Sequence, residues 1–200
     1  MTGSLSLLDW RRRVAALYAD VRATTDPARG HAQWRAGRDD LLAGHPQSPL
    51  LPEARRAFRG LPVATYDPAW RFEAVVEPAE PAGLEVPTGT DGVVRFDRLG
   101  TARLPGVGAL DVWWLVGYGG GVFVPVRDGS SGRTSYGGGR YLLDTVKGAD
   151  LGGDAARGRL VLDLNFTYNP SCAYDPAWAC PLAPAGNVLD VEVPVGEQLA

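Results

Sequence analysis

The sequence predicts an α+β fold, in which N-terminal helices pack on a mainly antiparallel β-structure, a small barrel or sandwich. Two observations lead to this fold class. Over residues 1–60 apolar side chains recur at helical spacing, and over residues 61–200 the apolar period falls to two. The period-two segments are short and are separated by Gly, Pro and Asp instead of long helices, so parallel βαβ units are not expected. A length of 200 residues suits a single domain made of these two sections.

The first helix is expected to begin at Ser6, because Ser6 and Asp9 have the spacing of a capping box. Its apolar residues recur every three or four positions, at Leu7, Trp10, Val14, Leu17, Tyr18 and Val21.

A second helix is expected to start at Asp26-Pro27, a capping residue followed by proline at the first helical position. Gly44 and Pro46 are its stop signals. A short third helix or turn is expected over residues 52–59, ending before Gly60.

The strands are expected where apolar and polar residues alternate between turn residues. Six segments satisfy this pattern, namely 71–76, 93–99, 110–118, 122–127, 160–166 and 188–195.

Composition excludes several classes of function. The formal net charge of −3 comes from interspersed acidic and basic residues, without the basic patch that nucleic-acid binding requires. No segment approaches the roughly 20 apolar residues of a membrane span, and Asp9 interrupts the N-terminal apolar run, so we expect a cytoplasmic protein. Cys172 and Cys180 are the two cysteines, which are too few for a disulfide scaffold. The sequence is compatible with one local disulfide between them.

A glycine-rich stretch at 127–141 is the first candidate for a site. Three consecutive glycines precede Arg140 and allow another group to approach the backbone closely, while Asp128 is suited to organise the turn. Arg140 would then hold an anionic or carbonyl oxygen. The alternative is a structural hairpin in which Arg140 forms an ion pair.

A second candidate is the stretch from Asp163 to Tyr174, extended by Cys180 and Asn187. Its prolines fix the loop and lower the entropic cost of presenting Asn and Tyr side chains in one geometry. The spacing of the two cysteines is too long for a zinc knuckle. Cys172 as a nucleophile would require a base such as His45, and a pair of buried thiols is the alternative.

The second helix is the third candidate, because His31, Trp34 and Arg38 fall on one face. Their polar ends must find partners in the β-rich section, for which Asp163 and Asn165 are candidates. A helix that is docked by salt bridges is the alternative.

Three groups of residues carry a family resemblance. They are Arg35-x-x-Arg38-Asp39 with His45-Pro46-Gln47-Ser48-Pro49-Leu50 and Phe58-x-Gly60-Leu61; Ser135-Tyr136-Gly137-Gly138-Gly139-Arg140-Tyr141; and Asp163-x-Asn165-x-x-Tyr168-Asn169-Pro170-x-Cys172-Ala173-Tyr174 with Cys180-Pro181, Asn187 and Gly196-Glu197. Over residues 34–197 the sequence thereby resembles the bacterial and archaeal family DUF1684. The resemblance implies no reaction, because the family has none assigned.

Three hypotheses follow for function. The first is a small-molecule-binding domain or enzyme acting on an anionic or carbonyl-containing ligand; the second is a structural polar core made by the same residues; the third is an interaction module that exposes Trp113 or Trp178. The sequence indicates no cofactor, no metal ligand, no membrane or nucleic-acid partner and no oligomeric state. For the first hypothesis the catalytic candidates are Asp128, Tyr136, Arg140, Cys172 and Glu197, and the ligand-binding candidates are His45, Ser131, Thr134, Tyr141, Asn165, Tyr168, Asn169, Tyr174 and Asn187.

Overall fold

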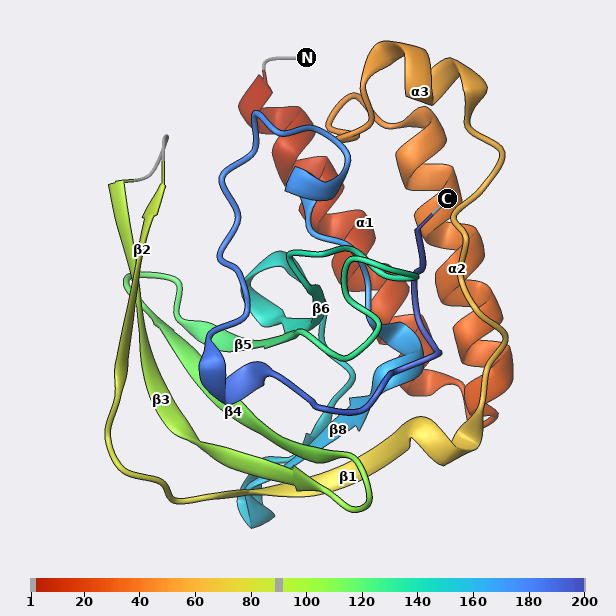
Figure 1. The fold of residues 1–200 in the computed structure, drawn as a ribbon. Helices are drawn as coiled ribbons and strands as arrows, with labels where there is room; N and C mark the ends of the chain where they lie inside the picture. Colours follow the sequence, from red (N-terminus) through yellow and green to blue (C-terminus); the bar gives the residue numbers. More distant parts are fainter. Residues whose placement is uncertain (1–2, 89–91, 200) are drawn as a thin grey trace.

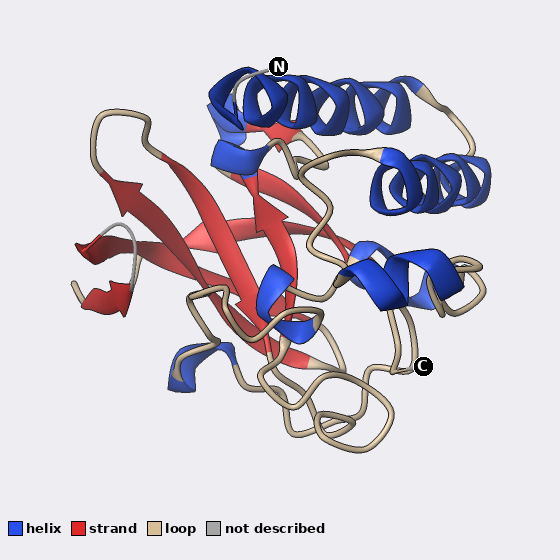
Figure 2. Cartoon of the chain, turned by 90° about the horizontal axis from the view of Figure 1, so that it is seen from above, coloured by secondary structure: helices blue, strands red, loops and turns tan. Residues whose placement is uncertain are grey.

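A computed structural model describes residues 3–88 and 92–199. It confirms the α+β class: three N-terminal helices pack beside an antiparallel sheet of eight strands that curls into a half-barrel (Figure 1). The helices lie together on one side of the curled sheet, as the view from above shows (Figure 2). No helix of the described ranges is long and apolar enough to cross a membrane.

The helices are α1 (Gly3–Ala23), α2 (Pro27–Gly44) and α3 (Pro52–Ala57). The start of α2 is as expected, because the Asp26 carboxylate accepts a hydrogen bond from the Ala28 N–H at 3.0 Å. The expected start of α1 is wrong. The Ser6 hydroxyl lies inside the helix and donates to the Gly3 carbonyl at 2.9 Å, so Ser6 caps nothing.

The strands follow the order β6-β5-β4-β3-β1-β8-β7, and β2 pairs with the N-terminal half of β3. All of these strand pairs are antiparallel. The strands are β1 (Arg71–Glu77), β2 (Gly83–Thr88), β3 (Gly92–Leu104), β4 (Gly108–Val116), β5 (Gly121–Val126), β6 (Arg140–Asp144), β7 (Gly153–Asp154) and β8 (Arg159–Asp163). The sequence prediction missed β2, β6 and β7.

Two predicted strands are corrected by the structure. The segment 160–166 leaves the sheet at Asp163, whose carboxylate accepts the Asn165 N–H at 3.1 Å and starts a 3₁₀ turn. Residues 188–195 form no strand, although buried and exposed side chains alternate along them. The Leu189 N–H donates to the Arg127 carbonyl, and the Val191 carbonyl accepts the Gly129 N–H. Val193 is bound instead by the side chains of Asp128 and Arg140, so no regular ladder forms.

The core has two parts. The larger cluster joins α1 and α2 to the sheet and includes Trp34, whose ring N–H donates to the Tyr18 hydroxyl at 3.0 Å. A smaller cluster consists of Phe96, Trp113, Phe123 and Tyr141. Trp113 is therefore buried, so it does not provide the exposed anchor that the interaction-module hypothesis requires, whereas Trp178 is 45% exposed.

Candidate functional site

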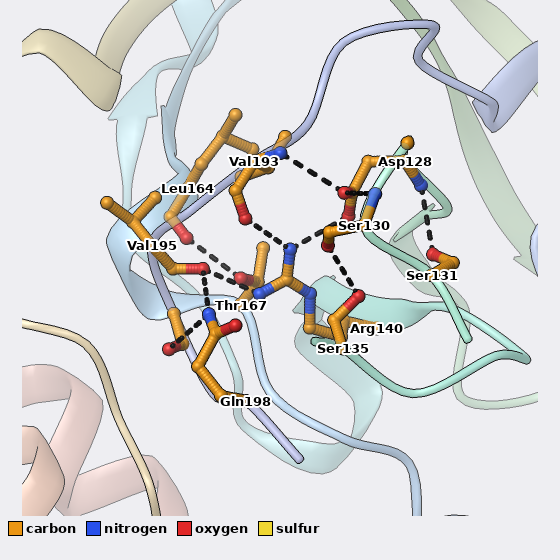
Figure 3. A network of polar contacts seen from close by, with 12 residues as sticks. Asp128, Ser130, Ser131, Ser135, Arg140, Leu164, Thr167, Val193, Val195 and Gln198 are labelled. Atoms are coloured by element: carbon orange, nitrogen blue, oxygen red, sulfur yellow. Dashed lines mark hydrogen bonds and ion pairs between the residues drawn. The ribbon is translucent and has the colours of Figure 1, made fainter. Parts of the chain in front are cut away.

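Arg140 begins β6, and its side chain is completely buried. The guanidinium donates to the Asp128 carboxylate at 2.8 Å and to the backbone carbonyls of Val193, Val195 and Glu197 at 3.0, 2.6 and 3.1 Å (Figure 3). These bonds attach the C-terminal segment 193–197 to β6. The geometry is that of the structural alternative, in which Arg140 forms an ion pair inside the fold.

Asp128 is the counter-ion of this network. Its carboxylate also accepts the N–H groups of Ser130 at 2.8 Å and Val193 at 3.1 Å. Burial by itself raises the pKa of Asp128, but the Arg140 charge and these hydrogen bonds outweigh burial and hold the pKa below its usual value. Asp128 is therefore an ionised acceptor at neutral pH and not a proton donor.

The other predicted residues of the loop 128–139 form contacts within the loop or with neighbouring segments. The Ser131 hydroxyl accepts the Asp128 N–H at 3.2 Å, and Thr134 is exposed, with its carbonyl accepting the Leu199 N–H at 2.9 Å. Tyr136 is half-buried and donates its hydroxyl to the Cys172 sulfur at 3.8 Å.

Asn165 and Asn187 are fully buried and hydrogen-bonded through both ends of the amide. Asn165 exchanges two bonds of 2.8 Å with the backbone of Asp67. Asn187 donates to the carbonyls of Asp111 and Pro125 at 2.8 and 2.9 Å and accepts from the Trp113 ring at 2.8 Å. Both amides thus join loops to the sheet.

The two histidines connect helices to their surroundings. His45 is buried at the end of α2, 3.1 Å from the Asp9 carboxylate, and accepts the Gln47 N–H at 3.1 Å. His31 donates to the Asn165 carbonyl at 3.0 Å, so the expected polar contact from α2 to Asn165 is present. Burial lowers the pKa of His31 and favours the neutral ring.

Glu197 is a completely buried carboxylate with four hydrogen-bond donors around it. Arg38 donates at 2.8 Å, Asn169 donates its backbone N–H at 3.1 Å and its side-chain amide at 3.0 Å, and the Tyr174 hydroxyl donates as well. Gly196 permits this placement: its φ is +78°, and a Cβ there would collide with Thr167. Each carboxylate oxygen therefore already accepts two bonds.

Four of the predicted ligand-binding residues, Tyr141, Tyr168, Asn169 and Tyr174, line one cavity of about 100 Å³. The cavity lies between α1, α2, β6 and the segment 168–174. Its remaining wall is mostly apolar and includes Trp10, Val14, Leu17, Tyr18, Leu41, Leu42, Pro49, Ala149 and Pro170, with Arg38, Asp144, Lys147, Ser171 and Cys180 also present. His45 adjoins this wall through its ring contact with Trp10, at a centroid distance of 5.2 Å.

Two buried polar atoms of this lining have no hydrogen-bond partner within the described part of the chain. They are the Nε donor of Arg38 and the Oδ1 acceptor of Asn169. The Tyr168 hydroxyl also forms no hydrogen bond there, and its ring lies under the Arg38 guanidinium at 4.7 Å. Native proteins rarely leave buried polar atoms unpaired, and the third such atom in the described part of the chain, Arg140 Nε, lies outside this lining.

The charges at the cavity cancel. Arg38 pairs with Glu197 at 2.8 Å, and Lys147 pairs with Asp144 at 3.3 Å. Burial by itself lowers the pKa of Arg38, but the Glu197 charge raises it above the usual value, so Arg38 remains a cation. Burial raises the pKa of Tyr18 to about 12 and also raises that of Tyr168, so both hydroxyls are neutral at physiological pH.

Cys172 and Cys180 lie together with free thiols beside the cavity. The Cys172 N–H donates to the Cys180 sulfur at 3.3 Å. Burial, with the neighbouring Cys180, raises the pKa of Cys172 to about 11. His45 bonds to Asp9 and Gln47, so it is not the base that a Cys172 nucleophile requires.

We expect Cys172 to react slowly with iodoacetamide. With its pKa at about 11, the thiolate fraction at pH 7.5 is on the order of a hundredfold below that of an ordinary cysteine. Mass spectrometry of proteolytic peptides from the natural protein, compared with a free cysteine peptide, measures the rate for Cys172 separately from that for Cys180. The rate should keep rising up to about pH 11, and labelling as fast as the peptide at pH 7.5 would restore Cys172 as a nucleophile.

The model of the family described as "Protein of unknown function (DUF1684)" matches residues 56–198. The chain belongs to the DUF1684 family. The solution NMR structure of an uncharacterized protein from Haloarcula marismortui is similar to this DUF1684 chain, with 35% identity and a TM-score of 0.58. The alignment covers 82% of this chain and 90% of the archaeal one. No curated protein gives a significant match.

The structure divides the predicted site residues of the DUF1684 chain into two groups. Around the cavity it gathers Tyr141, Tyr168, Asn169 and Tyr174, with Glu197, His45, Tyr136 and Cys172 next to its lining. Away from it lie Asp128, Ser131, Thr134, Arg140, Asn165 and Asn187.

Sequence reasoning placed Arg38 in its third candidate stretch but did not count it among the ligand-binding residues, and it missed Tyr18, Asp144 and Lys147. Arg38 carried a signal, because it shares a helix face with Trp34 and belongs to the family motif. The other three carried no comparable signal.

Proposed function

We propose that this DUF1684 chain binds a small neutral molecule bearing a carbonyl group, in the cavity between α1, α2 and β6. The observation that carries the proposal is the pair of unpartnered buried atoms, Arg38 Nε and Asn169 Oδ1. A ligand carbonyl oxygen would accept from Arg38, and a ligand N–H or O–H would donate to Asn169. A carboxamide head carries both functions.

The energetics favour occupation by such a ligand. An unpaired buried donor or acceptor costs about 1 to 3 kcal/mol, and a matching ligand group recovers that cost on binding. The apolar and aromatic wall adds the burial of the ligand's hydrocarbon part. A few polar groups in a mostly apolar pocket is the usual composition of a small-molecule site.

Charge balance supports a neutral carbonyl head over an anionic one. Glu197 already neutralises Arg38 at 2.8 Å, so a carboxylate ligand entering beside Arg38 would also meet the Glu197 charge. Like charges at such separations repel strongly in a partly desolvated site. A neutral amide avoids that repulsion and keeps both hydrogen bonds.

Binding is better supported than catalysis. A general acid or base works best with a pKa near the operating pH. Glu197 is saturated with hydrogen bonds, burial raises the pKa values of Cys172 and Tyr136, and Asp128 is held ionised by Arg140. The structure gives none of these groups the environment that would bring its pKa near 7, as a catalytic acid or base requires.

We expect butanamide to bind the cavity with a Kd on the order of 1 mM, the range open to a ligand of this size. Titration followed by ¹⁵N-edited NMR should shift the resonances of Asn169, Tyr174 and Arg38. A Val14→Phe variant should weaken binding at least tenfold, because Val14 is half-buried in the cavity wall and contributes no polar contact.

Val161→Phe is the matched control, since Val161 is a half-buried valine on β8 that does not line this cavity. The control should bind butanamide like the natural protein. Shifts that are absent, or that persist unchanged in Val14→Phe, would show that the cavity holds only water and would refute the proposed function.

A further inference from the structure

A second cavity, of about 190 Å³, is lined mainly by residues of β3, β4, β5 and β6 and shares part of its wall with the first; we call it the half-barrel cavity. Tyr141, Asp144 and Lys147 line both cavities. The half-barrel cavity is thus adjacent to the proposed ligand site, with Tyr141 and the Asp144–Lys147 ion pair between them.

The wall of the half-barrel cavity is mostly apolar, with Arg11, Thr88, Asp144 and Lys147 as its polar members. Phe96 and Phe123 stack at 5.1 Å, and the edge of Tyr141 meets Phe123 at 4.8 Å. The remaining apolar lining is contributed by Val94, Leu115, Val122, Val146, Ala179 and Pro181. A cavity of this composition recognises hydrocarbon and offers little to a polar group.

One hydrogen bond joins β6 to the segment 179–181, which forms part of the cavity wall. The Tyr141 hydroxyl donates to the Pro181 carbonyl at 2.6 Å, so the hydroxyl is already satisfied. On the other side of the shared wall, Arg38 and Asn169 keep their unpaired donor and acceptor. The unpartnered polar atoms therefore belong to the lining of the first cavity, and the mostly apolar wall belongs to the half-barrel cavity.

We infer that the ligand is an elongated amphiphile, a medium-chain fatty amide with an unbranched alkyl tail. The inference rests on the proposed function, which places the amide head at Arg38 and Asn169. The tail extends past Tyr141 into the half-barrel cavity.

The shared wall contains a side chain that is able to move aside. The Lys147 side chain is 59% exposed, whereas the side chain of its partner Asp144, at 3.3 Å, is 10% exposed. A tail that enters between the cavities displaces the flexible Lys147 stem toward water, while the ammonium stays near Asp144. An unbranched chain is the narrowest hydrocarbon tail, so it requires the smallest displacement of the shared wall.

Chain length gives a quantitative test. Each methylene transferred from water into an apolar cavity should tighten binding about fourfold. Isothermal titration calorimetry with butanamide, hexanamide and octanamide should therefore give a rising series. In the natural protein, octanamide should also shift NMR resonances of Leu115 and Phe123, which butanamide should leave in place.

Variants separate the tail from the head. Val94→Phe fills the half-barrel cavity, so it should abolish the gain from butanamide to octanamide and leave butanamide affinity unchanged. Val161→Phe, outside both cavities, should preserve the whole series. Octanoate, with the same tail and an anionic head, should bind at least tenfold more weakly than octanamide.

The outcomes distinguish the two proposals. Binding of butanamide with no gain for octanamide would overturn the inference about the tail and leave the proposed function standing. Failure of butanamide itself to bind would refute the proposed function. Octanoate binding as tightly as octanamide would overturn the assignment of a neutral amide head.

Discussion

Replacing Arg140 with alanine is expected to lower the free energy of unfolding by about 3 to 5 kcal/mol, because the change leaves the buried Asp128 charge without its partner. The carbonyls of Val193, Val195 and Glu197 lose a donor in the same step. For a chain of this length the loss corresponds to a fall in Tm of roughly 6 to 20 °C. Urea unfolding followed by circular dichroism measures it.

Arg133→Ala is the control for this prediction. Arg133 lies in the same loop and contacts Glu192, but both side chains are largely exposed, so its loss should change stability by about 0.5 kcal/mol or less. If Arg140→Ala cost no more than the control, the network in Figure 3 would not be what holds the C-terminal segment.

Replacing Glu197 with glutamine is expected to cost about 3 kcal/mol or more, although the two side chains have nearly the same shape. The variant leaves Arg38, whose side chain is 16% exposed, without a counter-ion. It also replaces one acceptor oxygen by a donor nitrogen among groups that all donate to Glu197. Urea unfolding of both proteins measures the difference.

The same substitution should alter ligand preference. With the Glu197 charge removed, the cavity becomes net positive. The affinity for octanoate should therefore rise relative to the affinity for octanamide, compared with the natural protein. Glu192→Gln is the matched control, because Glu192 is an exposed carboxylate five residues away whose loss should affect neither stability nor binding. An unchanged octanoate-to-octanamide ratio in Glu197→Gln would contradict the electrostatic account of the site.

Local chemistry explains which elements were predictable. Asp26 and Pro27 set the start of α2 through a hydrogen bond within three residues, so the sequence alone locates it. By contrast, residues 188–195 alternate like a strand but are bound by Arg140 and Asp128, which are more than 50 residues away. The spacing of apolar residues indicates which side chains are buried, but it does not indicate which groups the backbone N–H and C=O bond to.

The same distinction applies to the site. The Tyr-, Asn- and Pro-rich loop was recognisable because its composition exceeds what a turn requires, and Tyr168, Asn169 and Tyr174 do line the cavity. Arg140 and Arg38 are both arginines in family motifs. The Nε of each is unpartnered, but the folded structure gives them different surroundings. Arg140 donates to three backbone carbonyls and Asp128 away from the cavity, whereas Arg38 lies in the cavity lining.

The sequence by itself therefore determined the α+β class, the start of α2 at Asp26-Pro27, and the loops rich enough in polar groups to build a site. The tertiary structure decided which of those groups are satisfied by one another and which are left facing a cavity. Hydrogen bonding is the physical reason, because a buried donor is satisfied by whichever acceptor the fold brings within about 3 Å, and chain order does not fix that distance.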